Sequence, residues 1–154
     1  MLRVARLHAL ESELPVEYRE IAAETLAEES PGQFAVVTCM ELLEHVPQPG
    51  QTVAACAKLA KPGGLVVAST INRNPKAYAL AVIAAEYLLR LLPTGTHDYA
   101  KFLTPAELAG FARSAGLTAA GIAGVAYNPF ARSFRIVDDT SVNYMMAFRR
   151  PRDD

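Results

Sequence analysis

Two uninterrupted apolar runs constrain the fold of this chain more than any other feature. They cover residues 34–40 and 65–71, and each is typical of a strand buried on both faces, as in a parallel sheet. Between them, a helical pattern begins near Thr52 and ends at Leu59, before a Lys-Pro-Gly-Gly turn. Strand, helix, turn and strand make a βαβ unit, whose crossover we expect to be right-handed.

The rest of the chain continues the alternation of helices and strands, which favours a single α/β domain over 1–154. At Thr104, a threonine, a proline and an acidic residue form a helix-capping signal for a helix that ends near Gly116. No repeat or linker marks a second domain. Further helices are predicted over 2–10, 21–29 and 77–92, and further strands over 16–19, 117–126 and 142–148.

Composition excludes several classes of protein. The 15 basic and 16 acidic residues give a net charge of −1, so we expect no nucleic-acid partner. Cys39 and Cys56 are too few for a disulfide framework and are predicted to be small buried residues in a reducing compartment. The apolar stretch 77–92 contains Glu86 and Arg90 and is too short and too charged to span a bilayer. We therefore expect a cytoplasmic protein.

A cluster of polar residues follows the first buried strand, where open α/β sheets bind their ligands. Glu41, Glu44 and His45 are spaced i, i+3 and i+4, so they share one face if the segment forms a helical turn. Two carboxylates and an imidazole can bind a divalent cation or accept a proton from a substrate hydroxyl. A solvated turn without function is the alternative, and the spacing alone does not decide between the two.

Two segments resemble the middle motifs of class I S-adenosylmethionine-dependent methyltransferases, and more closely those of the ubiquinone biosynthesis O-methyltransferases. They are FAVVTCMELLEHVPQP at 34–49 and KPGGLVVASTINRN at 61–74. The more specific matches are GTHD at 95–98 and YNP at 127–129, and together the matches span nearly the whole chain. The resemblance implies a Rossmann-like sheet with helices on both faces.

The resemblance also implies a reaction and its residues. The family methylates a polyprenyl catechol with S-adenosylmethionine; Met40 corresponds to a residue beside the adenine of this cofactor. Glu41, Glu44 and His45 match proposed ligands of a divalent metal, magnesium or zinc. A metal-bound catechol has a lowered hydroxyl pKa and a fixed oxygen, ready for in-line attack on the sulfonium methyl. Direct proton removal by His45 is the alternative within this hypothesis.

Two cofactor-binding features of the family have no counterpart in these residues. They are a glycine-rich turn after the first strand and a carboxylate at the end of the second strand, which binds the ribose hydroxyls. The sequence therefore resembles a truncated methyltransferase domain that begins just past its second strand. The strand at 34–40 then gains an open edge, from which we expect self-association. The alternative function is an inactive fragment or interaction module that binds a partner methyltransferase or a membrane surface.

The apolar pattern at 77–92 has two interpretations. One is a helix that covers the sheet with its wide apolar face. The other is an interfacial helix that contacts the inner membrane face and admits the polyprenyl tail of the substrate. The quinone-precursor substrate implied by the resemblance favours the membrane contact.

Overall fold

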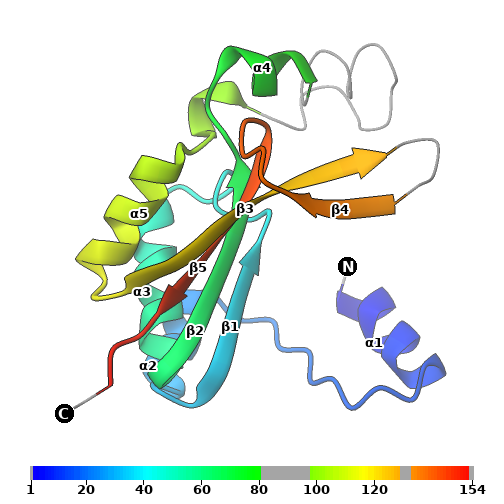
Figure 1. Ribbon diagram of the computed structural model, residues 1–154. Helices are drawn as coiled ribbons and strands as arrows, with labels where there is room; N and C mark the ends of the chain where they lie inside the picture. Colours follow the sequence, from blue (N-terminus) through cyan, green and yellow to red (C-terminus); the bar gives the residue numbers. More distant parts are fainter. Residues whose placement is uncertain (1, 81–97, 129–132, 153–154) are drawn as a thin grey trace.

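The computed structural model describes residues 2–80, 98–128 and 133–152 (Figure 1). Its helices are α1 (Leu2–Glu11), α2 (Ala23–Glu29), α3 (Pro49–Leu59), α4 (Pro75–Ala77) and α5 (Pro105–Ser114), with a 3-10 helix, η2 (Tyr99–Lys101). Its strands are β1 (Phe34–Met40), β2 (Ala60–Ile71), β3 (Thr118–Asn128), β4 (Ser133–Val137) and β5 (Asn143–Arg149).

The strands form one mixed sheet in the order β1-β2-β5-β3-β4. β1 and β2 are parallel, as the predicted βαβ unit requires, and α3 connects them. The later pairings, β2 with β5, β5 with β3 and β3 with β4, are antiparallel. The α/β prediction is therefore confirmed, with β1 as an edge strand on the parallel side of the sheet.

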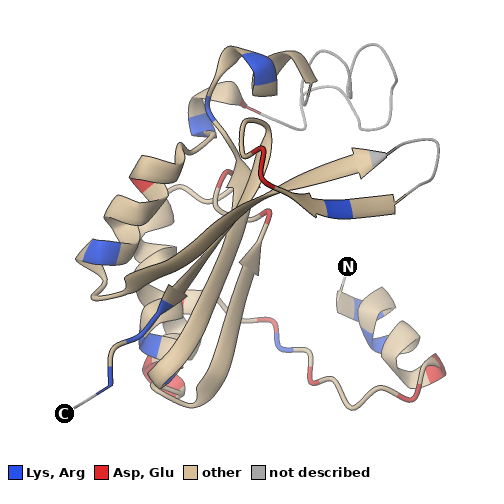
Figure 2. Cartoon of the chain, viewed as in Figure 1, with Lys and Arg blue, Asp and Glu red and all other residues tan. Residues whose placement is uncertain are grey.

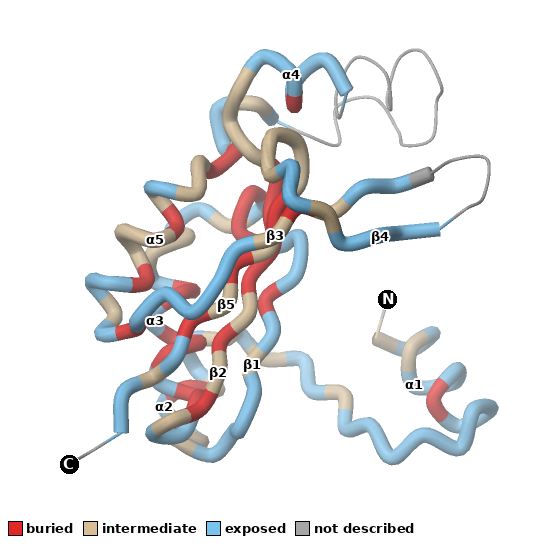
Figure 3. Tube along the Cα trace, viewed as in Figure 1, coloured by how far each residue is buried: buried red, intermediate tan, exposed pale blue. Residues whose placement is uncertain are grey.

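The main core lies between the sheet and three helices. α3 packs on β1 and β2, α5 packs on β3 and β5, and α2 packs on α3 (Figure 1). The largest fully buried side chains of this layer include Tyr144, Phe148, Leu108 and Val66. Buried and half-buried residues alternate over 64–68 of β2 and along most of β5, because only one face of the described sheet has this helical cover (Figure 3).

Both cysteines lie in this core, as predicted, on β1 and α3. A hydrogen bond with the Cys39 sulfur, together with burial, raises the pKa of the Cys56 thiol. Cys56 is therefore a packing residue with a protonated thiol rather than a nucleophile.

Gly63 and Gly64, near the start of β2, have a packing role. Gly63 adopts a left-handed φ of 75°. A Cβ on Gly64 would lie 2.7 Å from the Lys61 carbonyl oxygen and 3.0 Å from that of Ala35. The pair therefore allows two backbone segments to approach closely at the start of the β1–β2 pairing.

Three local predictions need correction. The strand predicted at 16–19 is wrong: this segment has no strand partner and runs between α1 and α2 without regular structure. The hairpin strand β4 was not predicted. The condition for one shared face of Glu41, Glu44 and His45 is not met, because Glu41 has a left-handed φ of 48° that ends β1 and separates it from the following turn. Most of the helix predicted at 77–92 lies outside the described residues.

Candidate functional site

The candidate site lies where the parallel strands β1 and β2 end side by side. Met40 is the last residue of β1 and is paired with Ser69 of β2. Glu41, Glu44 and His45 follow directly in the loop before α3. Figure 2 shows acidic residues just past the carboxyl end of β1. The predicted position of the site, at the carboxyl edge of the parallel pair, agrees with this arrangement.

Glu41 is fixed to the neighbouring strand by its backbone and its side chain. Its amide donates to the carbonyl oxygen of Ser69 at 3.1 Å and contacts the Ser69 hydroxyl oxygen at 3.1 Å. That hydroxyl donates to the Glu41 carboxylate oxygen Oε1 at 2.6 Å. A left-handed φ is uncommon for glutamate and costs conformational energy. The contacts to Ser69 stabilise this conformation and direct the carboxylate toward the end of β2.

Glu44 is the most unusual polar residue of the site because it is only 3% exposed. Its Oε2 accepts a hydrogen bond of 2.7 Å from the hydroxyl of Thr70, which is completely buried. Its Oε1 has no hydrogen-bond partner among the described residues. An unpartnered carboxylate oxygen is costly to bury, so Glu44 depends strongly on its one bond to Thr70.

The three predicted metal ligands are close in sequence but have separate environments. Glu41 bonds to Ser69, Glu44 is buried beside Thr70, and His45 is exposed in a turn closed by a bond from its amide to the Leu42 carbonyl at 2.9 Å. Within residues 2–80, 98–128 and 133–152, no three His, Cys, Asp or Glu side chains form a group that could hold a metal ion. In this arrangement the trio does not fit a three-ligand metal site.

Met40 offers an accessible apolar surface at the end of β1, with 45% of the residue exposed. Such a side chain can pack against an aromatic ring. The turns that follow β1 and β2 contain no glycine before α3 and α4 begin. The described carboxyl edge therefore presents an accessible apolar side chain, and its two turns lack the glycines that let a backbone approach a ligand closely.

An ion pair and a capping box order the other side of the site. Arg73 follows β2 and pairs with Glu107 in the first turn of α5. Glu107 also forms a capping box with Thr104, as the sequence pattern predicted. The Thr104 backbone amide is the main cause of a lowered Glu107 pKa, assisted by the Thr104 hydroxyl and by Arg73. The loop after β2 is thereby tied to the start of α5.

Tyr144 of β5 lies next to Thr70, with which it is paired across the sheet. Its hydroxyl donates to the Leu103 carbonyl at 2.9 Å, and burial raises the pKa of the phenol. Tyr144 is therefore a neutral structural donor.

The sequence analysis missed Ser69 and Thr70, which hold the two glutamates. The available signal was two hydroxyl residues at the carboxyl end of an otherwise apolar strand. In such a strand they face either the core or a ligand site, and in both cases they need a hydrogen-bond partner.

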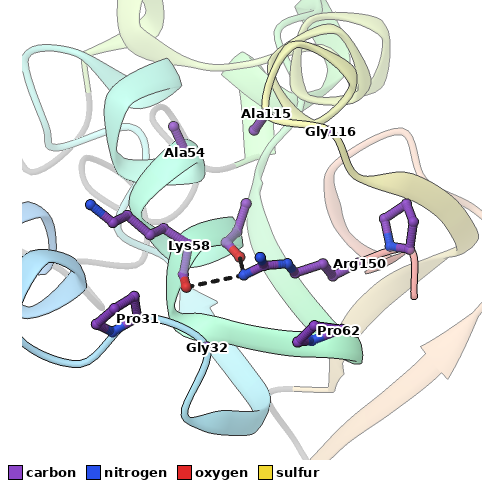
Figure 4. A pocket seen from close by; sticks show the side chains of 10 residues that line it. Pro31, Gly32, Ala54, Lys58, Pro62, Ala115, Gly116 and Arg150 are labelled. Carbon is purple, nitrogen blue, oxygen red and sulfur yellow. Dashed lines mark hydrogen bonds between the residues drawn. The ribbon is translucent and has the colours of Figure 1, made fainter. Parts of the chain in front are cut away.

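A cavity of ≈ 680 Å³ lies at the opposite end of the parallel strands, lined by Pro31, Lys58, Pro62 and Arg150 among others (Figure 4). The Arg150 guanidinium donates to the carbonyls of Ala57, Lys58 and Ala60 at 3.3, 3.3 and 2.7 Å. These bonds satisfy the last carbonyls of α3. The Arg150 cation therefore stabilises the end of α3.

Comparison with known proteins shows which family this chain resembles. A family described as a methyltransferase domain matches residues 6–120. A protein of Ralstonia nicotianae named ubiquinone biosynthesis O-methyltransferase is 63% identical over 150 residues, which is 97% of this chain and 63% of that protein. A protein of the same name from Pseudomonas aeruginosa is 57% identical, over 97% of this chain and 64% of its own length. The chain thus spans less than two thirds of these curated relatives.

A solved structure supports the fold assignment. A putative methyltransferase from Bacillus halodurans superposes with a TM-score of 0.64, at 16% identity, over 97% of this chain and 78% of its own. This likeness extends to nearly all of the present chain.

Proposed function

The chain belongs to the methyltransferase-domain family, and on this basis we propose that it serves in the S-adenosylmethionine-dependent O-methylation of a polyprenyl catechol in ubiquinone biosynthesis. The observation that carries the proposal is the 63% identity, over 150 residues of this chain, to a protein named ubiquinone biosynthesis O-methyltransferase. The chain spans 63% of that relative, so the activity of the whole enzyme is part of the proposal.

The reaction transfers a methyl group from sulfur to oxygen. When bound, S-adenosylmethionine supplies an electrophilic methyl on a sulfonium. The catechol oxygen forms the new O–C bond as the S–C bond breaks, and its proton must pass to a base. His45 is exposed and one residue from Glu44, so its imidazole is the proposed acceptor. Glu41, fixed by Ser69, is proposed to orient the catechol hydroxyls.

The divalent metal remains a prediction from the resemblance, and no step of the proposed chemistry depends on it. Its support is the residue types of Glu41, Glu44 and His45 together with the unpartnered Oε1 of Glu44. Its obstacle is the separation of the three environments described above. Adding magnesium or zinc to the assays below tests it: the prediction requires that one of them increases methyl transfer.

Membrane contact is a second part of the proposal, and its support comes from described residues before position 81. Tyr78 and Leu80 are 41% and 48% exposed and follow α4. No helix within the described ranges is long and apolar enough to cross a bilayer. We expect the chain to float with liposomes, and Tyr78→Glu with Leu80→Glu to reduce flotation. Ile136→Glu on β4, where the residue is 74% exposed, is the control for an added acidic residue away from this segment.

The decisive test combines cofactor binding with product formation. S-adenosylmethionine is titrated calorimetrically into the purified chain, and methyl transfer to a short-chain polyprenyl catechol is followed by mass spectrometry. We expect His45→Gln to lower kcat at least tenfold, with little change in cofactor affinity. Glu28→Gln, on α2 and paired with Lys58 at the other end of the sheet, is the control and should retain full activity. Equal activity of the His45 variant would contradict its assignment as base.

A second candidate function is an interaction module without catalysis. The observation that favours it is the apolar edge strand β1, whose Phe34, Val36 and Met40 are exposed. Product formation distinguishes the two functions. A chain that binds a partner but forms no methylated product, alone or with that partner, supports the interaction module.

A further inference from the structure

The loop that follows β2 is held from two sides. It covers residues 72–77, which include α4, and it begins directly after the strand end where Ser69 and Thr70 contact the glutamates. On one side, Arg73 ties it to the start of α5. On the other side lie residues 139–142, between β4 and β5, which we call the strap. In Figure 1 the strap is the orange-red loop next to the green chain that leads to α4.

Two asparagine side chains of this loop bind the backbone of the strap. Asn72 Nδ2 donates to the Thr140 carbonyl oxygen at 3.0 Å. Asn74 Nδ2 donates to the Ser141 carbonyl oxygen at 2.7 Å. The Asn72 backbone amide adds a bond of 2.8 Å to the Val142 carbonyl oxygen. All three acceptors are main-chain oxygens of one short segment, so these bonds fix where the loop lies relative to the strap.

Asn74 has a second contact that can be separated from the first. Its Oδ1 accepts a hydrogen bond of 2.9 Å from the Ala77 amide and caps α4, while its Nδ2 contacts the strap. An aspartate in its place keeps the capping oxygen and loses the donor. Asn74→Asp therefore removes the contact to the strap without removing the cap of α4.

The strap is itself fixed to the sheet. The Asp139 carboxylate accepts a bond of 2.9 Å from the Ser141 amide at Oδ1 and one of 2.8 Å from the Lys76 ammonium at Oδ2. The Asp139 backbone also lies so close to β3 that a Cβ on Gly124 would overlap its carbonyl oxygen. Only a glycine leaves room for this approach. The strap therefore has a defined position on the sheet, from which it holds the loop.

The opposite side of the loop is held by polar and apolar contacts. Arg73 Nη1 donates to the Phe102 carbonyl oxygen at 3.2 Å, and its Nη2 pairs with Glu107. Ile71, Ala77 and Phe102 pack together in a small buried cluster. Every polar side chain of the loop thus contacts another segment of the chain. Contacts from both sides hold the loop in one conformation beside the candidate site.

We propose that Asn72 and Asn74 are positioning residues for the methyl transfer: by binding the strap, they hold the loop after β2 as a fixed wall for the catechol ring of the acceptor. The inference rests on the proposed function, which supplies the acceptor. The loop borders the carboxyl edge, where α/β sheets bind their ligands. A wall that is ordered before binding lowers the entropic cost of binding. Loss of the strap contacts should therefore weaken acceptor binding and leave cofactor binding unchanged.

The test measures acceptor affinity, cofactor affinity and turnover of the full 154-residue chain. A short-chain polyprenyl catechol and S-adenosylmethionine are titrated calorimetrically, and methyl transfer is followed by mass spectrometry. We expect Asn74→Asp to raise the Kd and the KM of the catechol by about tenfold, with little change in the Kd of the cofactor. Gln33→Glu makes the same amide-to-carboxylate change at an exposed position before β1, at the other end of the sheet, and should change none of these constants.

A second set of variants tests the strap from outside the loop. Asp139→Ala removes the acceptor that orders the strap and should also raise the Kd of the catechol. Asp139→Asn keeps Oδ1 for the Ser141 amide and should restore most of the affinity, because the lost ion pair to Lys76 is exposed. Since Asn72→Asp and Asn74→Asp act through the same strap, the double variant should bind the catechol little worse than either single variant.

The outcomes separate positioning from folding and from catalysis. The Asp139 side chain is 60% exposed, so Asp139→Ala keeps the fold even if Asn74→Asp does not. Unchanged catechol affinity in the folded variants would overturn the proposal and leave a strap that only stabilises the chain. Catechol binding by the wild-type chain without a methylated product contradicts the proposed function alone, because the affinities still test the strap. A wild-type chain that binds no catechol overturns both.

Discussion

The buried bond between Thr70 and Glu44 gives the sharpest prediction about the candidate site. Thr70→Val removes the hydroxyl that donates to Glu44 Oε2 at 2.7 Å and keeps nearly the same side-chain shape. Thr70 is completely buried and Glu44 is 3% exposed, so water does not readily replace the lost donor. Because Oε1 has no partner among the described residues, the carboxylate of the variant loses its one described side-chain hydrogen bond.

The expected size of this effect follows from the cost of an unpartnered buried group. A hydrogen bond to a charged group contributes about 1.5–3 kcal/mol, and burial of the group without its partner lies at the upper end. We therefore expect Thr70→Val to lower the free energy of unfolding by about 3 kcal/mol, a large share of the about 5–15 kcal/mol of a typical domain.

Urea denaturation followed by circular dichroism measures this loss, and Thr52→Val is the matched control. Thr52 is also buried and donates to a glutamate, Glu24, at 2.9 Å, but Glu24 is exposed and water can replace the bond. The control should therefore lose only about 1 kcal/mol. In a double-mutant cycle with Glu44→Leu, the second change should recover at least about 1 kcal/mol of the Thr70→Val loss. Equal losses in the two valine variants, or strict additivity in the cycle, would refute the reasoning.

Three further predictions test other contacts. The pKa of Glu107 is lowered in the folded chain, mainly by its N-cap amide, so its stabilising effect is present above the unfolded pKa and is lost as pH falls through the folded value. Glu107→Gln should therefore reduce the fall of Tm at acid pH. The free energy of unfolding involved is less than about 1 kcal/mol, because the Glu107 side chain is 37% exposed. Glu41→Gly should be more stable in thermal melts than Glu41→Ala by about 1 kcal/mol, because φ is 48°; the opposite order would contradict the left-handed conformation. Gly64→Ala should cost more than about 2 kcal/mol in urea denaturation, because its Cβ meets a backbone oxygen at 2.7 Å, whereas Gly110→Ala in α5 has open space and should be neutral or stabilising.

The sequence was informative wherever a local pattern determined the structure. The apolar runs predicted β1 and β2, and the Thr104 capping signal predicted the start of α5, because burial periodicity and capping act within a few residues. The strand at 16–19 failed for the opposite reason. A strand exists only with a neighbour, and no described strand lies beside that segment.

The place of the candidate residues in the fold was predicted, but their contacts were not. The carboxyl edge follows from the βαβ topology, so Glu41 and Glu44 could be placed near it from sequence. Their separate environments depend on Ser69 and Thr70, which are 28 and 26 residues away from Glu41 and Glu44 in the chain and adjacent only through the β1–β2 register. The left-handed φ of Glu41 could not be predicted either, since glutamate rarely adopts it.

The two glutamates and Met40 differ in how the described chain holds them. Glu41 and Glu44 accept hydrogen bonds from hydroxyls of β2, so contacts within the described residues hold their side chains. The apolar edge of β1, in contrast, leaves Met40 half exposed and has no glycine turn beside it. The Glu41 carboxylate is therefore held in place by a contact inside the described residues. It follows that Ser69→Ala, which removes the hydroxyl that donates to Glu41, should impair the proposed methyl transfer, and unchanged methyl transfer would contradict a role for this contact.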